Sequence, residues 1–71
     1  MSIELFLVLE DKDTKHYNVF YSSGDFEEFI KTINLDEYVY ISIYLEIDGE
    51  LNWSLSKIYK QRYKHILKSP Y

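Results

Sequence analysis

The sequence predicts an α+β fold: a single domain over residues 1–71, with a small antiparallel sheet of three to four strands and two helices in the order ββαββα. Two segments alternate apolar and polar residues with a period of two, which is typical of strands with one buried face. Two others place apolar residues three and four positions apart, as amphipathic helices do. The chain is 46% hydrophobic and 18% aromatic, which excludes a disordered protein.

The first two strands are predicted to form a hairpin. Along the first strand, one face is formed by the aliphatic residues Ile3, Leu5, Leu7 and Leu9. They alternate with Glu4, Phe6, Val8 and Glu10, which form the other face. The polar segment 11–15 then breaks the pattern, and residues 16–21 are rich in β-branched and aromatic side chains. If the first strand lies at an edge of the sheet, its charged residues discourage pairing with other molecules.

A short helix is predicted to follow. Asp25 and Glu28 have the spacing of a capping box, so we expect the helix to start near Phe26. Its apolar stripe consists of Phe26, Phe29, Ile30 and Ile33. Asn34 is suited to end the helix in a left-handed conformation.

The second half of the chain repeats this order. Residues 39–47 alternate aliphatic side chains with a row of tyrosines that includes Tyr38, Tyr40 and Tyr44, and they are expected to form a central strand. Asp48-Gly49 predicts a type I′ turn, followed by a short strand over 50–53. Ser54 or Ser56 should cap a basic helix that Pro70 ends.

Two interpretations remain open for the tyrosine row. Tyr38, Tyr40 and Tyr44, with Tyr17 or Tyr21 from the hairpin, can form an aromatic strip at which another protein binds, since tyrosine is enriched at interfaces. Alternatively, the second helix covers this face and the rings belong to the core.

Charge is distributed unevenly along the chain, whose net charge is −4. Residues 1–50 contain all twelve acidic residues and three lysines, whereas residues 51–71 contain five basic residues and no acid. The two regions can attract each other within the fold or across a dimer. An acidic body can instead present carboxylates to a protein that normally holds phosphates, and a basic tail can contact nucleic acid.

Composition also bounds the cellular setting. The chain has no cysteine, so a reducing compartment is expected. Its longest apolar run, residues 5–9, is too short to cross a membrane, and the N-terminus lacks the features of a signal peptide. We therefore expect a cytoplasmic protein with no membrane partner.

Catalytic chemistry is not expected. His16 and His65 have no motif-spaced serine, and there is no cysteine to act as a nucleophile. Gly24 and Gly49 are too few for a phosphate-binding loop, and the acidic pairs have no metal-ligand pattern. The sequence thus predicts no catalytic residue, no metal site and no cofactor.

Several of these features together resemble a known family. An acidic turn, a tyrosine-containing second strand, the run Ser22-Ser23-Gly24-Asp25-Phe26-Glu27 and an alternating third strand are similar to the small phage inhibitors of uracil-DNA glycosylase. The resemblance covers residues 3–47, a ββαβ core, while the hairpin and basic helix of 48–69 are an extension. The residues after Glu27 depart from the family pattern.

The resemblance implies a homodimeric DNA mimic in the host bacterial cell. Its partner would be the host uracil-DNA glycosylase, with no direct binding of nucleic acid. Carboxylates would replace phosphates, and Phe26 would help to form an apolar dimer pocket for the side chain that the enzyme drives into DNA, although Phe26 can equally pack inward. The predicted partner-binding residues are Asp25, Phe26, Glu27, Phe29, Ile30, Glu4, Glu10, Asp11, Tyr17 and Tyr21.

Two alternatives remain beside this prediction. One is an acidic binding module or an inhibitor of another host protein, with the tyrosine strip as its interface. The other is a nucleic-acid accessory protein that uses the basic residues of the second helix, namely Lys57, Lys60, Arg62, Lys64 and Lys68.

Overall fold

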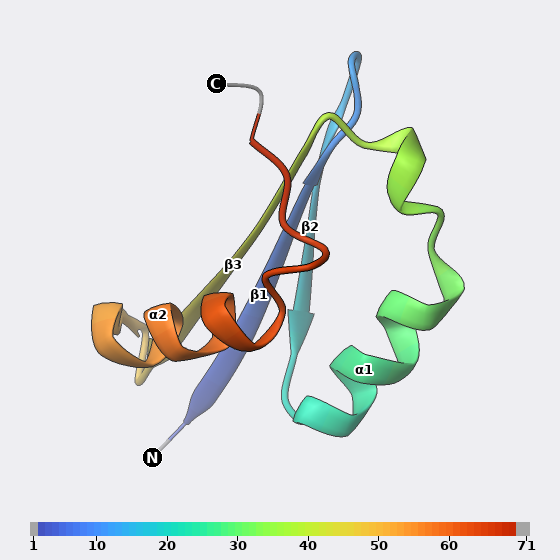
Figure 1. Cartoon of the computed structure of the whole chain (residues 1–71). Helices are drawn as coiled ribbons and strands as arrows, with labels where there is room; N and C mark the ends of the chain where they lie inside the picture. Colours follow the sequence, from blue (N-terminus) through green and yellow to red (C-terminus); the bar gives the residue numbers. More distant parts are fainter. Residues whose placement is uncertain (1, 70–71) are drawn as a thin grey trace.

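The computed structural model describes residues 2–69 and confirms the α+β fold (Figure 1). Its elements are β1 (Ile3–Glu10), β2 (Lys15–Phe20), α1 (Ser23–Thr32), the short 3₁₀ helix η1 (Leu35–Glu37), β3 (Tyr40–Ile47), β4 (Glu50–Leu51) and α2 (Trp53–Arg62). The strands form one antiparallel sheet in the order β2-β1-β3-β4. None of the described helices is long and apolar enough to span a membrane.

β1 lies inside the sheet, which corrects its interpretation as an edge strand. It pairs with β2 on one side, where Val8 faces Tyr17, and with β3 on the other, where Phe6 faces Tyr44. β2 and the short β4 are the edge strands. Both faces of β1 carry apolar side chains, with Leu5, Leu7 and Leu9 in the core and Phe6 and Val8 on the opposite face.

The turn between β3 and β4 has the predicted geometry. Asp48 and Gly49 both have positive φ, 51° and 82°, as a type I′ turn requires. The Asp48 side chain also accepts a hydrogen bond from the Ser2 backbone at 2.7 Å, so this turn holds the start of β1. β4 itself is shorter than the predicted strand over 50–53.

The caps of α1 differ from the prediction. Ser22, in an extended conformation, is the N-cap, and its hydroxyl accepts a hydrogen bond from the backbone of Asp25 at 3.2 Å. Asp25 therefore lies in the first turn of the helix and not before it. At the other end, Ile33 is extended, and Asn34, with φ −91°, caps η1 instead of closing α1 in a left-handed conformation.

α2 begins earlier than expected because Asn52, and not a serine, is its cap. The Asn52 side chain accepts from the backbone of Leu55 at 2.9 Å. Ser56 is fully buried, and its hydroxyl accepts from the Leu45 backbone N–H at 2.8 Å. The helix ends at Arg62, well before Pro70, which lies outside the described residues.

The chain after α2 returns to the sheet. Lys68 forms an antiparallel bridge with Ile41 on β3, and its ammonium donates to the backbone carbonyls of Leu35 and Tyr38. This segment thus continues the outer edge of β3 beyond β4, and it also holds η1 against the body of the protein.

A single apolar core lies between the sheet and the helices. The aliphatic residues of β1 and β3 contribute one side, and Phe26, Tyr63 and Ile66 contribute the other. The sheet side consists of Leu5, Leu7, Leu9, Ile41, Ile43 and Leu45. The helices therefore pack on the aliphatic face, so the interpretation in which the second helix covers the tyrosine row is wrong.

Candidate functional site

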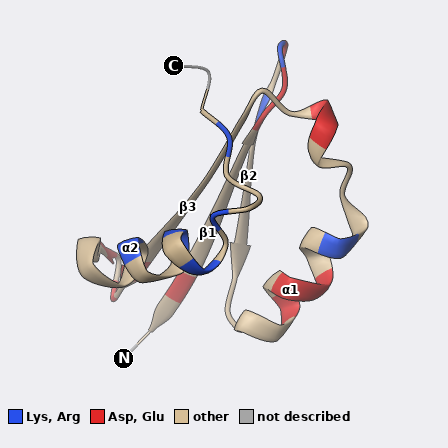
Figure 2. Ribbon diagram, in the orientation of Figure 1, with Lys and Arg blue, Asp and Glu red and all other residues tan. Residues whose placement is uncertain are grey.

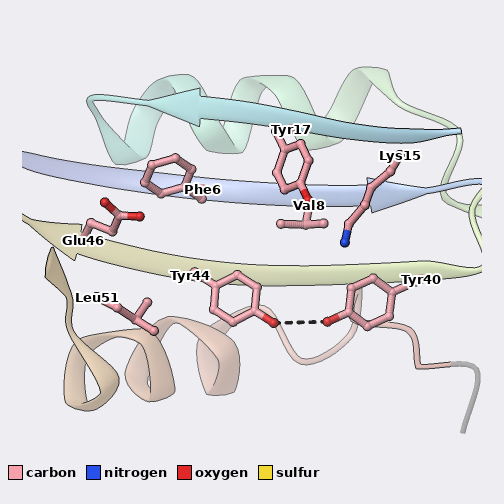
Figure 3. A pocket seen from close by; sticks show the side chains of 8 residues that line it. All are labelled: Phe6, Val8, Lys15, Tyr17, Tyr40, Tyr44, Glu46 and Leu51. Atoms are coloured by element: carbon pink, nitrogen blue, oxygen red, sulfur yellow. Dashed lines mark hydrogen bonds between the residues drawn. The ribbon is translucent and has the colours of Figure 1, made fainter. Parts of the chain in front are cut away.

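The uncovered side of the sheet is an aromatic face, which we define by Phe6 and Val8 of β1, Tyr17 and Val19 of β2, and Tyr40, Ser42 and Tyr44 of β3. Figure 3 shows these strands side by side with the side chains of the hollow. The hollow measures about 360 Å³ and is lined by Phe6, Val8, Lys15, Tyr17, Tyr40, Tyr44, Glu46 and Leu51. Tyr38, which the sequence placed in this row, packs against the core instead.

The tyrosines of β3 form a hydrogen-bonded pair on this face. The Tyr40 and Tyr44 hydroxyls lie 3.2 Å apart. The pKa of Tyr44 is lowered by the Ser42 hydroxyl, by Tyr40 and by the nearby Lys60. The pKa of Tyr40 is raised, because the lowering by Ser42 is outweighed by the hydrogen bond with Tyr44 and by partial burial.

Charged residues stand at the two ends of the aromatic face. At one end Glu10 lies between Lys15 and Tyr40 on the neighbouring strands. At the other, Glu4 lies directly opposite Glu46, an arrangement of like charges that costs stability.

A basic groove borders the aromatic face along the outer edge of β3. It measures about 470 Å³ and is lined by Tyr40, Ile41, Ser42, Lys60, Lys64, Leu67, Lys68 and Ser69. No acidic side chain is among these lining residues. Lys60 joins the two hollows, because its ammonium lies 4.3 Å from the centre of the Tyr44 ring. No local pattern in the sequence indicates that α2 and the segment after it place lysines beside the tyrosine row.

An acidic flank lies on another part of the surface. It consists of the exposed residues Asp25, Glu27 and Glu28 of α1 and Asp36 and Glu37 of η1, with Lys31 among them. Figure 2 shows the acidic positions of α1 and η1 (red) apart from the basic positions of α2 (blue). Within residues 2–69, the basic C-terminal region forms one ion pair with the flank, between Lys68 and Asp36 at 4.0 Å, and the Tyr63 hydroxyl donates a hydrogen bond to Glu27. Attraction within the fold therefore leaves most of these carboxylates unneutralised.

A smaller apolar hollow adjoins the start of α1. It measures about 170 Å³ and is lined by Ile3, Leu5, Phe20, Tyr21, Ser22, Ser23, Leu45 and Tyr59. Tyr21 at its rim is 74% exposed. Ser22 and Ser23 lead directly into the acidic first turn of α1, so apolar and anionic groups lie close along the chain here.

The predicted site residues are dispersed. Asp25 and Glu27 lie on the acidic flank, Tyr21 lines the apolar hollow, and Tyr17, Glu4 and Glu10 project from the open side of the sheet. Phe26 has no exposed surface, and its ring centre lies 4.8 Å from that of Tyr63. Phe29 and Ile30 are half-buried against the core. Phe26 therefore packs inward, the second of the two roles open to it.

Asp11 closes the turn between β1 and β2. Its carboxylate accepts hydrogen bonds from the backbone of Asp13 and from the Thr14 hydroxyl, both at 2.8 Å. Hydrogen bonds from the Thr14 and Asp13 backbone lower its pKa to about 2. Thr14 also contacts the His16 ring at 3.0 Å. These groups satisfy one another within an exposed turn, and the described residues contain no cluster of metal-ligating side chains.

Comparisons with known proteins find no match to this chain among family models, curated proteins or solved structures. The resemblance to the small phage inhibitors thus depends on the short sequence features quoted above. The structure itself defines a class of surface: a small α+β scaffold with one open aromatic face and one acidic flank.

Proposed function

We propose that this protein inhibits a DNA-binding enzyme by binding it in place of DNA, and that the enzyme is the host uracil-DNA glycosylase. The observation that carries the proposal is the acidic flank, whose carboxylates are exposed and largely unpaired. A protein that binds DNA holds phosphates with lysine and arginine side chains, and such a surface attracts a row of carboxylates.

The apolar hollow supplies a second element of the proposal. A glycosylase must unstack its target base to reach it, and apolar wedges are a common means of opening the stack. Because Phe26 is buried, the hollow beside Tyr21 replaces it here as the site that receives the wedge. Its 170 Å³ is large enough for one aliphatic side chain.

A homodimer is also part of the proposal. The register leaves the outer backbone groups of β2 without a strand partner, at positions such as Tyr17 and Val19, because hydrogen bonding alternates along an antiparallel pair. Pairing of two β2 edges would extend the sheet across a two-fold axis. Size-exclusion chromatography with light scattering tests this, and a monomer mass at micromolar concentration contradicts it.

Uracil excision is the direct test. A bacterial uracil-DNA glycosylase is incubated with a double-stranded uracil-containing oligonucleotide and titrated with this protein, with heat-denatured protein as the control. We expect stoichiometric loss of excision. The double variant Asp25→Asn/Glu28→Gln should weaken inhibition, and more so at low salt, whereas Glu50→Gln, an equally exposed acid on β4, should not.

Two outcomes count against the proposal. Full excision at a large excess of folded protein, with enzymes from several bacteria, removes the glycosylase as the partner. Inhibition that is insensitive to the flank variants removes DNA mimicry as the mechanism. In the first case the flank belongs to an acidic binding module for another host protein, which capture from a host lysate would identify.

A further inference from the structure

We infer that the aromatic face and the basic groove together form a binding site for single-stranded nucleic acid, separate from the acidic flank. The inference departs from the expectation that this protein makes no direct contact with nucleic acid. It depends on the juxtaposition of an aromatic hollow and a lysine-lined groove that share Tyr40.

The aromatic face has the features of a base-stacking platform. Phe6 and Tyr44 are direct neighbours on adjacent central strands, and Tyr17, which faces Val8, is 62% exposed. Figure 3 shows these side chains on one side of the sheet. Single strands are commonly bound by an antiparallel sheet with helices on its far side and aromatic rings on its open side, because every base has a face that can stack.

The basic groove adds positive charge beside a hollow whose own lining contains one lysine, Lys15, and one glutamate, Glu46. Lys60 of α2 and Lys64 of the turn that follows α2 line the groove beside Tyr40, and the groove lining contains no carboxylate. Lys68 donates to two backbone carbonyls, Lys64 is exposed, and Lys60 lies over the Tyr44 ring, so Lys64 and Lys60 are the groove lysines that we assign to phosphates. A strand whose bases stack on the platform can thus place its backbone along the outer edge of β3.

The distribution of charge around the aromatic face favours binding of a nucleic acid strand over binding of another protein. It also determines the direction in which the strand crosses this face. Glu4 and Glu46 lie opposite each other and repel phosphates at the far end of the aromatic face. At the end near Tyr40, Glu10 has Lys15 as its neighbour on β2, and this end opens into the lysine groove. The strand therefore crosses from Phe6 to Tyr44 and leaves through the groove. A second copy of the chain would have to bury the same glutamates, which is costly without paired cations.

Fluorescence anisotropy with labelled dT12 and rU12 tests the inference on the intact protein. Tyr44→Ala and Phe6→Ala should each weaken binding by about tenfold, since stacking on one ring contributes roughly that much. Tyr44→Phe keeps the ring and should bind as the parent does. Tyr21→Ala removes an exposed tyrosine outside the face and is the matched control; circular dichroism verifies that each variant is folded.

The lysines are tested through the salt dependence. Lys60→Ala and Lys64→Ala should each reduce the magnitude of the slope of log K against log salt concentration by about 0.7, as expected when one single-strand phosphate contact is lost. Lys57→Ala, on the same helix but outside the groove, should leave the slope unchanged.

Several results would overturn the inference. These are no anisotropy change with either oligonucleotide at low salt, equal weakening by Lys57→Ala and Lys60→Ala, or binding of dTMP as tight as that of dT12. Inhibition of the glycosylase on duplex DNA is measured in parallel with Tyr44→Ala. Because the two surfaces are separate, retained inhibition with lost oligonucleotide binding is the expected result.

Discussion

The Tyr63 hydroxyl donates a 2.9 Å hydrogen bond to the Glu27 carboxylate and thereby connects α1 to the turn that follows α2. Burial and this hydrogen bond raise the pKa of Tyr63. The contact is the polar counterpart of the ring contact between Tyr63 and Phe26, one residue before Glu27. It shows that the C-terminal extension is packed against the region that carries the family resemblance.

Tyr63→Phe should lower the free energy of unfolding by about 1 kcal/mol, because it removes the hydrogen bond and keeps the ring. Urea denaturation followed by circular dichroism measures the loss. Glu27→Gln should cost a similar amount, and the double variant should cost less than the sum of both. Additive losses would show that the two side chains do not interact in solution.

Phe26→Ala should lower the free energy of unfolding by about 3–5 kcal/mol, because it leaves a cavity among Phe20, Tyr63 and the sheet. Phe26→Leu should cost less. Chemical denaturation provides the measurement, with Tyr21→Ala as the exposed aromatic control. Unchanged stability of Phe26→Ala would mean that Phe26 is not part of the core in solution.

Ser56→Ala should destabilise the protein by about 1–3 kcal/mol despite its small change in volume. The Ser56 hydroxyl satisfies the buried backbone N–H of Leu45 and donates to its carbonyl at 3.3 Å. Alanine would leave the Leu45 N–H without that partner in an apolar setting, whereas the Leu45 carbonyl still accepts from the Asn52 backbone at 2.9 Å. Ser54→Ala, on the exposed side of the same helix, is the control and should be nearly neutral in thermal unfolding.

The turn at Asp11 should make stability depend on pH in the acid range. Its pKa is lowered from 3.8 to about 2 by hydrogen bonds that require the charged carboxylate. The stabilising contribution is therefore complete above the ordinary pKa and is lost as the pH falls from 3.8 toward 2. Asp11→Asn should flatten the stability profile over that interval, and NMR titration of the Asp11 carboxyl group should report the lowered pKa directly.

Gly49→Val should lower the melting temperature, because the residue has a φ of 82° and a β-branched side chain is strained there. A loss of about 1–2 kcal/mol is expected. Gly24→Ala is a useful comparison, since Gly24 lies in helix α1 without positive φ and alanine favours helix formation. An equal effect of both substitutions on thermal unfolding would contradict the turn assignment.

The sequence patterns were sufficient to identify most of the fold. Alternation along β1 and β3 separates Leu7 and Ile43 from Phe6 and Tyr44, and a period of two permits only one assignment of faces. The Asp48-Gly49 turn was equally clear, because few other residue pairs accept positive φ at both positions.

Caps and strand order were harder to predict. Ser22 and Asp25 are both good helix caps, and only the backbone conformation decides which of them accepts the first hydrogen bond. Strand order had no clear sequence signal. The apolar residues on both faces of β1 are compatible with a central position in the sheet and with a position at its edge. The proximity of Lys60 to Tyr44 depends on how α2 crosses β3, and that crossing has no local sequence signal.

The sheet order also affects how the chain reaches its native state. β1 is fully paired only after β3 has been synthesised. β2 pairs with one edge of β1, whereas the other edge pairs with β3, where Ile3 lies opposite Ile47. The closing bridge between Ile41 and Lys68 needs a segment that is made later still. During synthesis the apolar β1–β2 hairpin therefore emerges before the other half of the core. Its pairing with β3 is slowed, because the long segment between the two strands must first be closed into a loop. Folding of this small domain is completed only after the segment around Lys68 has left the ribosome, so the nascent hairpin is the stage most exposed to aggregation and to chaperones.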